Sequence, residues 1–86
     1  TDEITNLGGT PAPLSLLYHI NLGRPFLEAG ARNAVACRAM APRDARAAEG
    51  LETHELYAGP SADYAEQAYY YEPAADAAGW STAVLH

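Results

Sequence analysis

The chain has 86 residues, a length that suits one small domain with a thin core. Its net charge is −6, and its five arginines are scattered among acidic residues, which argues against binding to nucleic acid or to an anionic membrane. No segment has the apolar length of a bilayer-spanning helix, and the first residues do not resemble a signal peptide.

The N-terminal part contains the strongest strand signal of the chain. Residues 2–6 fit a short strand, which the glycines and prolines of residues 7–13 end in a loop. In residues 14–22 every second residue is apolar, which predicts a half-buried strand. The alternating apolar row consists of Leu14, Leu16, Tyr18, Ile20 and Leu22. Pro25 cannot donate to a central ladder, so the predicted strand ends before it.

The rest of the chain alternates between predicted strands and turns. Residues 31–40 predict a weaker strand of small residues, and residues 43–50 a short helix with Pro42 near its first turn and Gly50 in a left-handed closing position. Residues 51–63 predict an irregular connection, residues 64–73 an aromatic-rich strand and residues 74–79 a turn. Residues 80–86 predict a last strand, whose partner we expect beyond residue 86.

Strands separated by Gly/Pro turns indicate a mainly β, antiparallel protein with one short helix near residues 43–50. The chain begins with Thr1 and ends on the apolar run Ala83-Val84-Leu85 before His86. We therefore interpret residues 1–86 as a single incomplete domain, an internal segment of a longer protein.

His19 and Asn21 lie on the face of the predicted strand opposite the apolar row, because side chains alternate along a strand. A polar pair that lines a wet cleft can bind a ligand. Alternatively, the pair lies on an exposed sheet face or hydrogen-bonds a neighbouring loop, and spacing alone favours this second interpretation.

The segment "TNLGGTPAPLSLLYHINLGRPFL" resembles the aldose 1-epimerase (galactose mutarotase)-like superfamily, closest to an uncharacterised epimerase-like branch with the pattern L-L-Y-H-I-N-x-G-x-P-x-L. The segments "PRDARAAEGL" and "YAEQAYYYEP" resemble the same branch, in the same order, so the resemblance covers roughly residues 4–86. It implies a galactose mutarotase-like β-sandwich (supersandwich), of which this chain would be a part.

The resemblance also implies a role for His19. Characterised mutarotases have P-x-N-L-T-N-H-x-Y-F-N-L at the corresponding place, and aligning Pro13 with its proline puts His19 on the histidine that protonates the sugar ring oxygen. An imidazole suits this role because it exchanges a proton near neutral pH. The present sequence is two residues shorter after His19, so Asn21 aligns only across a deletion.

A second correspondence is weaker and concerns the sugar hydroxyls. "YAEQAYYY" resembles the family's F-D-H segment, which places Glu66 on an aspartate that accepts hydrogen bonds from the sugar and Gln67 on the histidine. A solvated strand residue is an equal interpretation of Glu66. Arg24 could meet an anionic sugar substituent, although exposure or a salt bridge to Glu28 is the simpler expectation. The family's general base has no counterpart here, and Glu72 is at the wrong position for it.

Other reactive side chains give no second site. His19, His54 and His86 are too dispersed to form a zinc site, and no motif indicates a cofactor. Cys37 fits a reducing cytoplasm and predicts a buried, inert thiol.

Our main hypothesis is a cytoplasmic sugar-binding protein that interconverts anomers, of which this segment alone is inactive because it lacks the base. A non-catalytic carbohydrate-binding module of the same fold and a remnant that offers only an interaction surface are the alternatives. The expected partner in the first two cases is a small-molecule sugar.

Overall fold

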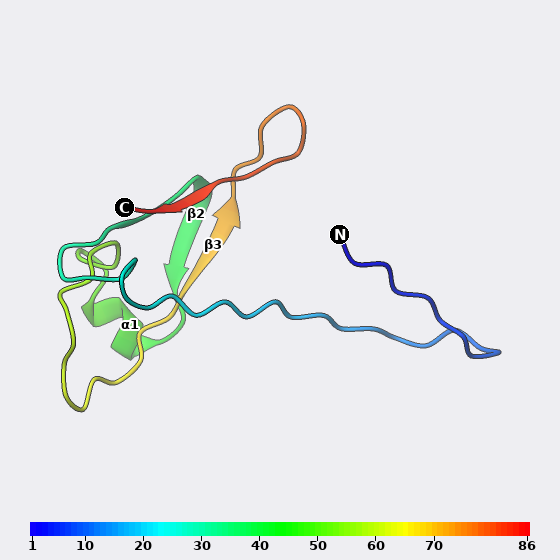
Figure 1. Cartoon of the computed structure of the whole chain (residues 1–86), viewed down its shortest axis with the longest axis horizontal. Coiled ribbons are helices and arrows are strands. Elements are labelled where there is room, and N and C mark those ends of the chain that lie inside the picture. Colours follow the sequence, from blue (N-terminus) through cyan, green and yellow to red (C-terminus); the bar gives the residue numbers. More distant parts are fainter.

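The computed structural model describes all 86 residues, most of which lie in turns and irregular segments. It contains four short strands and one helix: β1 (Asn33–Val35), β2 (Cys37–Pro42), α1 (Ala45–Glu49), β3 (Tyr69–Pro73) and β4 (Ala83–Leu85). These elements and the loops between residues 23 and 86 form a small body, from which the N-terminal segment extends away (Figure 1). The helix has neither the length nor the hydropathy that crossing a bilayer requires.

The strands form one bent antiparallel ribbon. β2 pairs with β3, and β1 pairs with β4, each pair as a two-stranded antiparallel sheet. β1 and β2 are separated only by Ala36, whose N–H donates to the carbonyl of Thr82 and whose carbonyl accepts from the N–H of Ala74. These two bonds close the base of the loop 74–82, which interrupts the returning strand between β3 and β4. The predicted strands near residues 31–40, 64–73 and 80–86 are thus confirmed as shorter elements.

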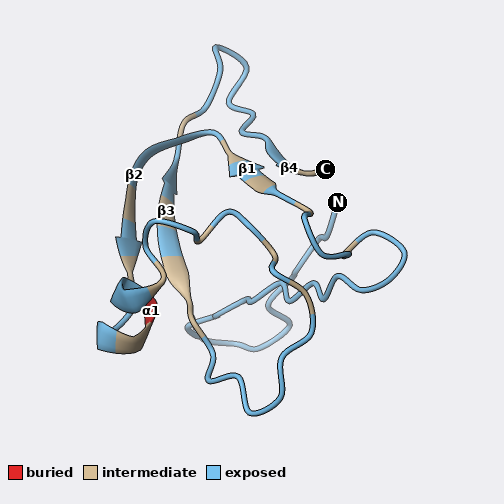
Figure 2. Cartoon of the chain, turned by 90° about the vertical axis from the view of Figure 1, so that its left-hand side faces the viewer, coloured by how far each residue is buried: buried red, intermediate tan, exposed pale blue.

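Helix α1 forms next to the ribbon, within the predicted range 43–50. The carboxylate of Asp44 caps it by accepting from the backbone N–H of Ala47 over 2.9 Å. A carboxylate in this position satisfies one of the amides that the first helical turn leaves unpaired. Ala47 is also the only fully buried residue of the chain (Figure 2).

The N-terminal segment contradicts the strongest strand prediction. Residues 14–22 have no regular structure, and the apolar row remains exposed, up to 81% for Ile20. Alternation of apolar and polar residues gives a segment one face that can be buried in a sheet. A strand also needs a neighbouring strand whose backbone groups form hydrogen bonds with its own N–H and C=O groups. Here no strand lies beside it, and residues 2–6 are likewise irregular. We call residues 1–22 the arm.

The extended arm makes the chain larger than a compact domain of the same length. The radius of gyration is 17.0 Å, whereas a compact chain of this length has about 12 Å. The predicted antiparallel pairing and the single short helix are confirmed, but as small elements in a chain that is mostly irregular instead of mainly β. We expected a partial antiparallel β-sandwich; the structure shows two two-stranded antiparallel sheets, with no second layer over them.

Four local predictions also need correction. Pro42 ends β2 instead of opening the helix, because Asp44 is the N-cap. Gly50 has φ −98°, so it is not left-handed. Cys37 is exposed instead of buried, since the ribbon has no covering layer. The last strand finds its partner within the chain, as Val84 faces Ala34 of β1.

Candidate functional site

His19 and Asn21 lie together on the arm. The Nε2 atom of His19 is 3.1 Å from the side-chain oxygen of Asn21, and both residues are exposed. An amide oxygen only accepts, so this contact corresponds to the tautomer or charge state in which Nε2 carries a proton. Of the two interpretations of this pair, exposure is the one seen here, because the segment lies in the open as part of the arm (Figure 1).

Arg24 lies where the arm meets the body, after residue 22 and before the cis Arg24–Pro25 peptide bond. It is exposed and lines a cavity of about 540 Å³ together with Glu28 and Tyr57. The salt bridge to Glu28 that the sequence suggested is absent. Arg24 therefore has no ion-pair partner in this structure.

Glu66 and Gln67 lie just before β3, where they contact the region of the helix. The Glu66 carboxylate accepts from Nη1 of Arg43 over 2.7 Å, and Arg43 in turn donates from Nε to Asp44 over 3.0 Å. Pairing with Glu66, and secondly with Asp44, raises the pKa of Arg43. The Glu66 side chain remains 74% exposed, so it can still accept hydrogen bonds from a ligand.

Both polar atoms of the Gln67 side chain form hydrogen bonds within the protein. Its Nε2 donates to the backbone carbonyl of Arg46 over 2.9 Å, and its Oε1 accepts from the hydroxyl of Tyr64. The structure thus brings together His19 with Asn21, and Glu66 with Gln67, but not the two pairs with each other. The cavities lined by Arg24 and by Gln67 do not include His19.

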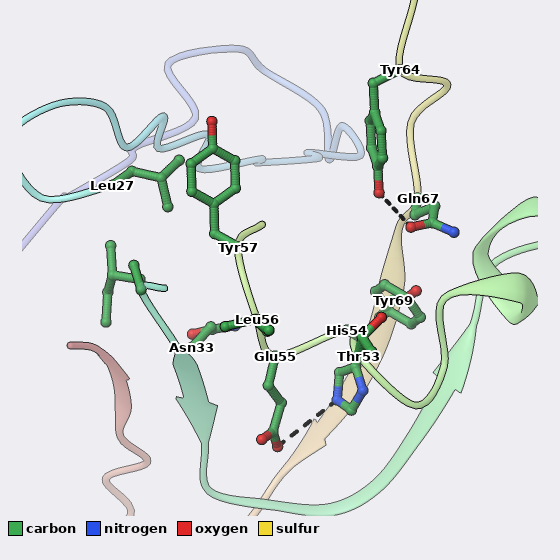
Figure 3. A pocket seen from close by; sticks show the side chains of 12 residues that line it. Leu27, Asn33, Thr53, His54, Glu55, Leu56, Tyr57, Tyr64, Gln67 and Tyr69 are labelled. Atoms are coloured by element: carbon green, nitrogen blue, oxygen red, sulfur yellow. Dashed lines mark hydrogen bonds and ion pairs between the residues drawn. The ribbon is translucent and has the colours of Figure 1, made fainter. Parts of the chain in front are cut away.

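A second group of side chains, which sequence reasoning did not connect, surrounds a cavity of about 270 Å³ that we call the His54 cavity (Figure 3). Its polar and aromatic lining includes Asn33, His54, Glu55, Tyr57, Tyr64 and Tyr69. They come from β1, from the irregular connection 51–63 and from the residues around the start of β3. Their convergence depends on the tertiary structure, and the only local signal is the clustering of titratable residues in "ETHE", residues 52–55.

The His54 side chain is only 14% exposed, whereas that of the adjacent Glu55 is 55% exposed. The Nδ1 atom of His54 lies 2.7 Å from the backbone carbonyl of Leu51, and because a carbonyl only accepts, Nδ1 is the donor. Its Nε2 lies 4.0 Å from the Glu55 carboxylate. The ring packs against Tyr69, with 5.2 Å between the ring centroids. His54 therefore has a fixed orientation with Nε2 free for a ligand.

No group of three or more His, Cys, Asp or Glu side chains is arranged to hold a metal ion. The polar groups described above are suited to hydrogen bonding and charge pairing with an organic ligand.

Comparison with known proteins gives a family but no relative of established activity. No curated protein and no solved structure matches the chain. A family model described as Domain of unknown function (DUF4432) matches residues 1–86, the whole sequence. The chain therefore belongs to the DUF4432 family.

Proposed function

We propose that this chain is the acid-bearing segment of an aldose 1-epimerase-like protein that binds a monosaccharide or a derivative and interconverts its anomers. The single observation that carries the proposal is the motif "LLYHINLGRPFL", which resembles that superfamily. The contact of His19 with Asn21 supports it only by bringing two polar side chains of the motif together, with Nε2 of His19 3.1 Å from the Asn21 side-chain oxygen.

In the proposed reaction, His19 protonates the ring oxygen while a base removes the proton of the anomeric hydroxyl. The hemiacetal C–O bond breaks, the carbonyl forms, and re-closure on either face gives the two anomers. Glu66 would accept hydrogen bonds from sugar hydroxyls, and its exposed carboxylate supports that role. Arg24 would meet an anionic substituent, and Asn21 and Gln67 would contribute further hydrogen bonds.

Because no residue here corresponds to the family's base, we expect the 86-residue chain to bind sugar without exchanging anomers. The exchange belongs to the longer protein of which we propose this chain to be part. In that protein, the side chains of the arm and of the body would have to approach each other to share one ligand.

Saturation-transfer NMR on the longer protein tests the proposal directly. His19→Gln should reduce the rate of anomer exchange by about 100-fold or more, the usual contribution of a positioned general acid. His86→Gln is the matched control, because His86 is also exposed but belongs to the segment after β4.

Each outcome separates the hypotheses. Loss of exchange in His19→Gln alone supports the epimerase proposal. Sugar binding with exchange that His19→Gln does not affect removes His19 from the reaction, and binding without any exchange favours a non-catalytic carbohydrate-binding module. Absence of any sugar-induced resonance shift rejects both sugar hypotheses.

A further inference from the structure

The arm has the residue pattern of a strand but no partner strand. The large apolar side chains at every second position of residues 14–22 are all more than half exposed. Residues 4–22 include no Asp, Glu, Lys or Arg, although charged side chains are one of the features that keep an unpaired strand from pairing with another chain. The arm is therefore suited to pairing with the edge of a sheet.

The outer edge of β3 carries unpaired backbone groups. The N–H of Arg43 donates to the carbonyl of Ala68 over 2.9 Å, just beyond the β2–β3 pair. Because hydrogen-bonded pairs alternate along antiparallel strands, the backbone groups of Tyr70 point towards β2, and those of Tyr69 and Tyr71 point towards the outer edge. β2 is the only strand beside β3, so this edge has no partner.

The surface next to this edge is mostly apolar. A hollow of about 470 Å³ lies on β2 and β3, and its lining consists of Ala39, Met40, Ala41, Tyr70, Tyr71, Glu72 and Pro73. The outer edge of β1, in contrast, is already occupied, because the N–H of Asn33 donates to the carbonyl of Glu55 over 2.8 Å. The β3 edge is therefore the one that can accept a further strand with an apolar face.

The chain exposes enough surface for a stable interface. Its accessible surface is 7525 Å², whereas a folded monomer of its mass, 9.1 kDa, exposes about 4,900 Å². The excess of about 2,600 Å² is larger than the roughly 800 Å² that each partner buries in a standard protein interface. Pairing of the arm can therefore remove a full interface area from water.

The direction of the arm favours a second copy of the chain as the partner. The arm leaves the body at a turn in which the N–H of Leu27 donates to the carbonyl of Gly23 over 3.0 Å, and it runs away from the body (Figure 1). Its own β3 edge consequently stays unpaired. Each copy thus offers one unpaired strand and one unpaired edge, and two copies can satisfy each other in a closed, two-fold symmetric exchange.

We propose that the chain forms a homodimer by exchange of arms, in which residues 14–22 of each copy add as a strand to the outer edge of β3 of the other. The row from Leu14 to Leu22 then packs on the apolar β2–β3 surface of the second copy. An arm that is irregular before binding loses conformational entropy when it pairs, so we expect a Kd on the order of 100 μM. Well below that concentration the arm is free and exchanges its amide hydrogens rapidly.

Paramagnetic NMR on the 86-residue chain tests the exchange between copies. A nitroxide is attached to Cys37, the exposed and only cysteine, which lies opposite Pro73 of β3. This chain is mixed, well above the expected Kd, with isotope-labelled Cys37→Ser chain. The amide resonances of residues 14–22 in the labelled chain should broaden, and broadening should fade on dilution. The nitroxide and the observed amides are on different chains, so the effect reports only contacts between copies.

Two matched arm variants test the apolar row by sedimentation equilibrium. Ile20 and Leu17 are 81% and 85% exposed, but Ile20 belongs to the row and Leu17 to the opposite face. Ile20→Lys should raise the dimer Kd about tenfold or more, because it places a charge in the interface. Leu17→Lys should change it by no more than about twofold. Unchanged body resonances show that neither variant disturbs the fold.

Several results would overturn the proposal. One is a chain that stays monomeric up to its solubility limit, and another is broadening of the arm only when nitroxide and isotope label are on the same chain, which means that the arm pairs with its own ribbon. Equal weakening by Ile20→Lys and Leu17→Lys indicates non-specific association, and species larger than a dimer exclude reciprocal exchange. His19→Gln should leave the dimer Kd unchanged, so failure of this proposal is distinct from failure of the sugar proposal.

Discussion

The side-chain amide of Gln67 donates a hydrogen bond of 2.9 Å to the backbone carbonyl of Arg46, a residue 21 positions earlier. The Tyr69 hydroxyl makes a parallel bond of 2.8 Å to the next carbonyl, that of Ala47. Together they attach the start of β3 to helix α1, whose five residues are too few to be stable alone. These long-range bonds, with the Asp44 cap, are what keep the helix in place.

Gly50 lies against the two side chains that attach β3 to α1. A Cβ at this position would lie 2.6 Å from Oε1 of Gln67 and 2.8 Å from the Tyr69 hydroxyl. We expect Gly50→Ala to displace both side chains and lower the free energy of unfolding by about 1–3 kcal/mol. Urea denaturation followed by circular dichroism measures this. Gly23→Ala, which meets no atom within 4 Å, is the control, and an equal loss in both variants would refute the explanation.

The cap at Asp44 makes the stability of α1 depend on pH. The bond from the Ala47 N–H, and secondly the pairing with Arg43, lowers the pKa of Asp44 below its usual 3.8. A carboxylate with a lowered pKa in the folded state stabilises the fold above its unfolded-state pKa, and this contribution is lost as the pH falls through the folded-state value.

We therefore expect the amide of Ala47 to lose protection from hydrogen exchange, beyond the intrinsic pH effect, on acidification from about pH 6 to pH 3. Asp44→Asn keeps a capping oxygen but has no charge to titrate, so its protection should stay constant over the same range. A variant that loses protection as the original chain does would show that another group controls the effect.

The arm should exchange its amide hydrogens much faster than the body. No backbone amide of residues 1–22 donates to another backbone carbonyl, and in the arm only the amide of Gly8 has a partner, the side chain of Asn6. In the body, by contrast, Arg32 and His86 exchange hydrogen bonds of 2.7 and 3.0 Å. Hydrogen-exchange mass spectrometry should find near-complete exchange of the arm at the first time point. Protection across residues 14–22 would mean that this segment pairs as a strand in solution.

The pairing of Glu66 with Arg43 allows a structural role of Glu66 to be separated from a role in binding. The pair is largely exposed, so Glu66→Gln should change the midpoint of thermal unfolding by no more than the experimental error. If Glu66 contacts sugar hydroxyls, the same variant should weaken sugar binding about tenfold, as expected for a lost charge-assisted hydrogen bond.

Glu49→Gln is the matched control for this experiment, because Glu49 is also an exposed carboxylate paired with an arginine, Arg46. It should affect neither property. A large drop in thermal stability for Glu66→Gln with sugar binding retained would assign Glu66 to the fold and remove it from the proposed site.

Local signals predicted several elements correctly, because their causes lie within a few residues. The helix near residues 43–50 is present since its alanines favour helix and Asp44 supplies the cap. The alternating small residues of 31–40 do form strands, and the turn at 74–79 is closed by the Asp76 carboxylate, which accepts from the amides of Ala78 and Trp80.

The arm shows where local signals fail. Its alternation is more regular than that of β1 or β2, yet only the latter have partner strands in this structure. Likewise, sequence reasoning selected His19 from its motif and set aside His54, whose packing against Tyr69 depends on segments that meet only in the folded body.

The sequence by itself determined the acidic charge, the position of the short helix, the turn at residues 74–79 and which segments are able to form strands. Only the tertiary structure decided which strands pair, that the row from Leu14 to Leu22 stays exposed, and that a carboxylate and three tyrosines enclose one cavity. The physical reason is that propensity and capping act between neighbouring residues, whereas strand pairing and cavities are created by contacts between residues far apart in the chain.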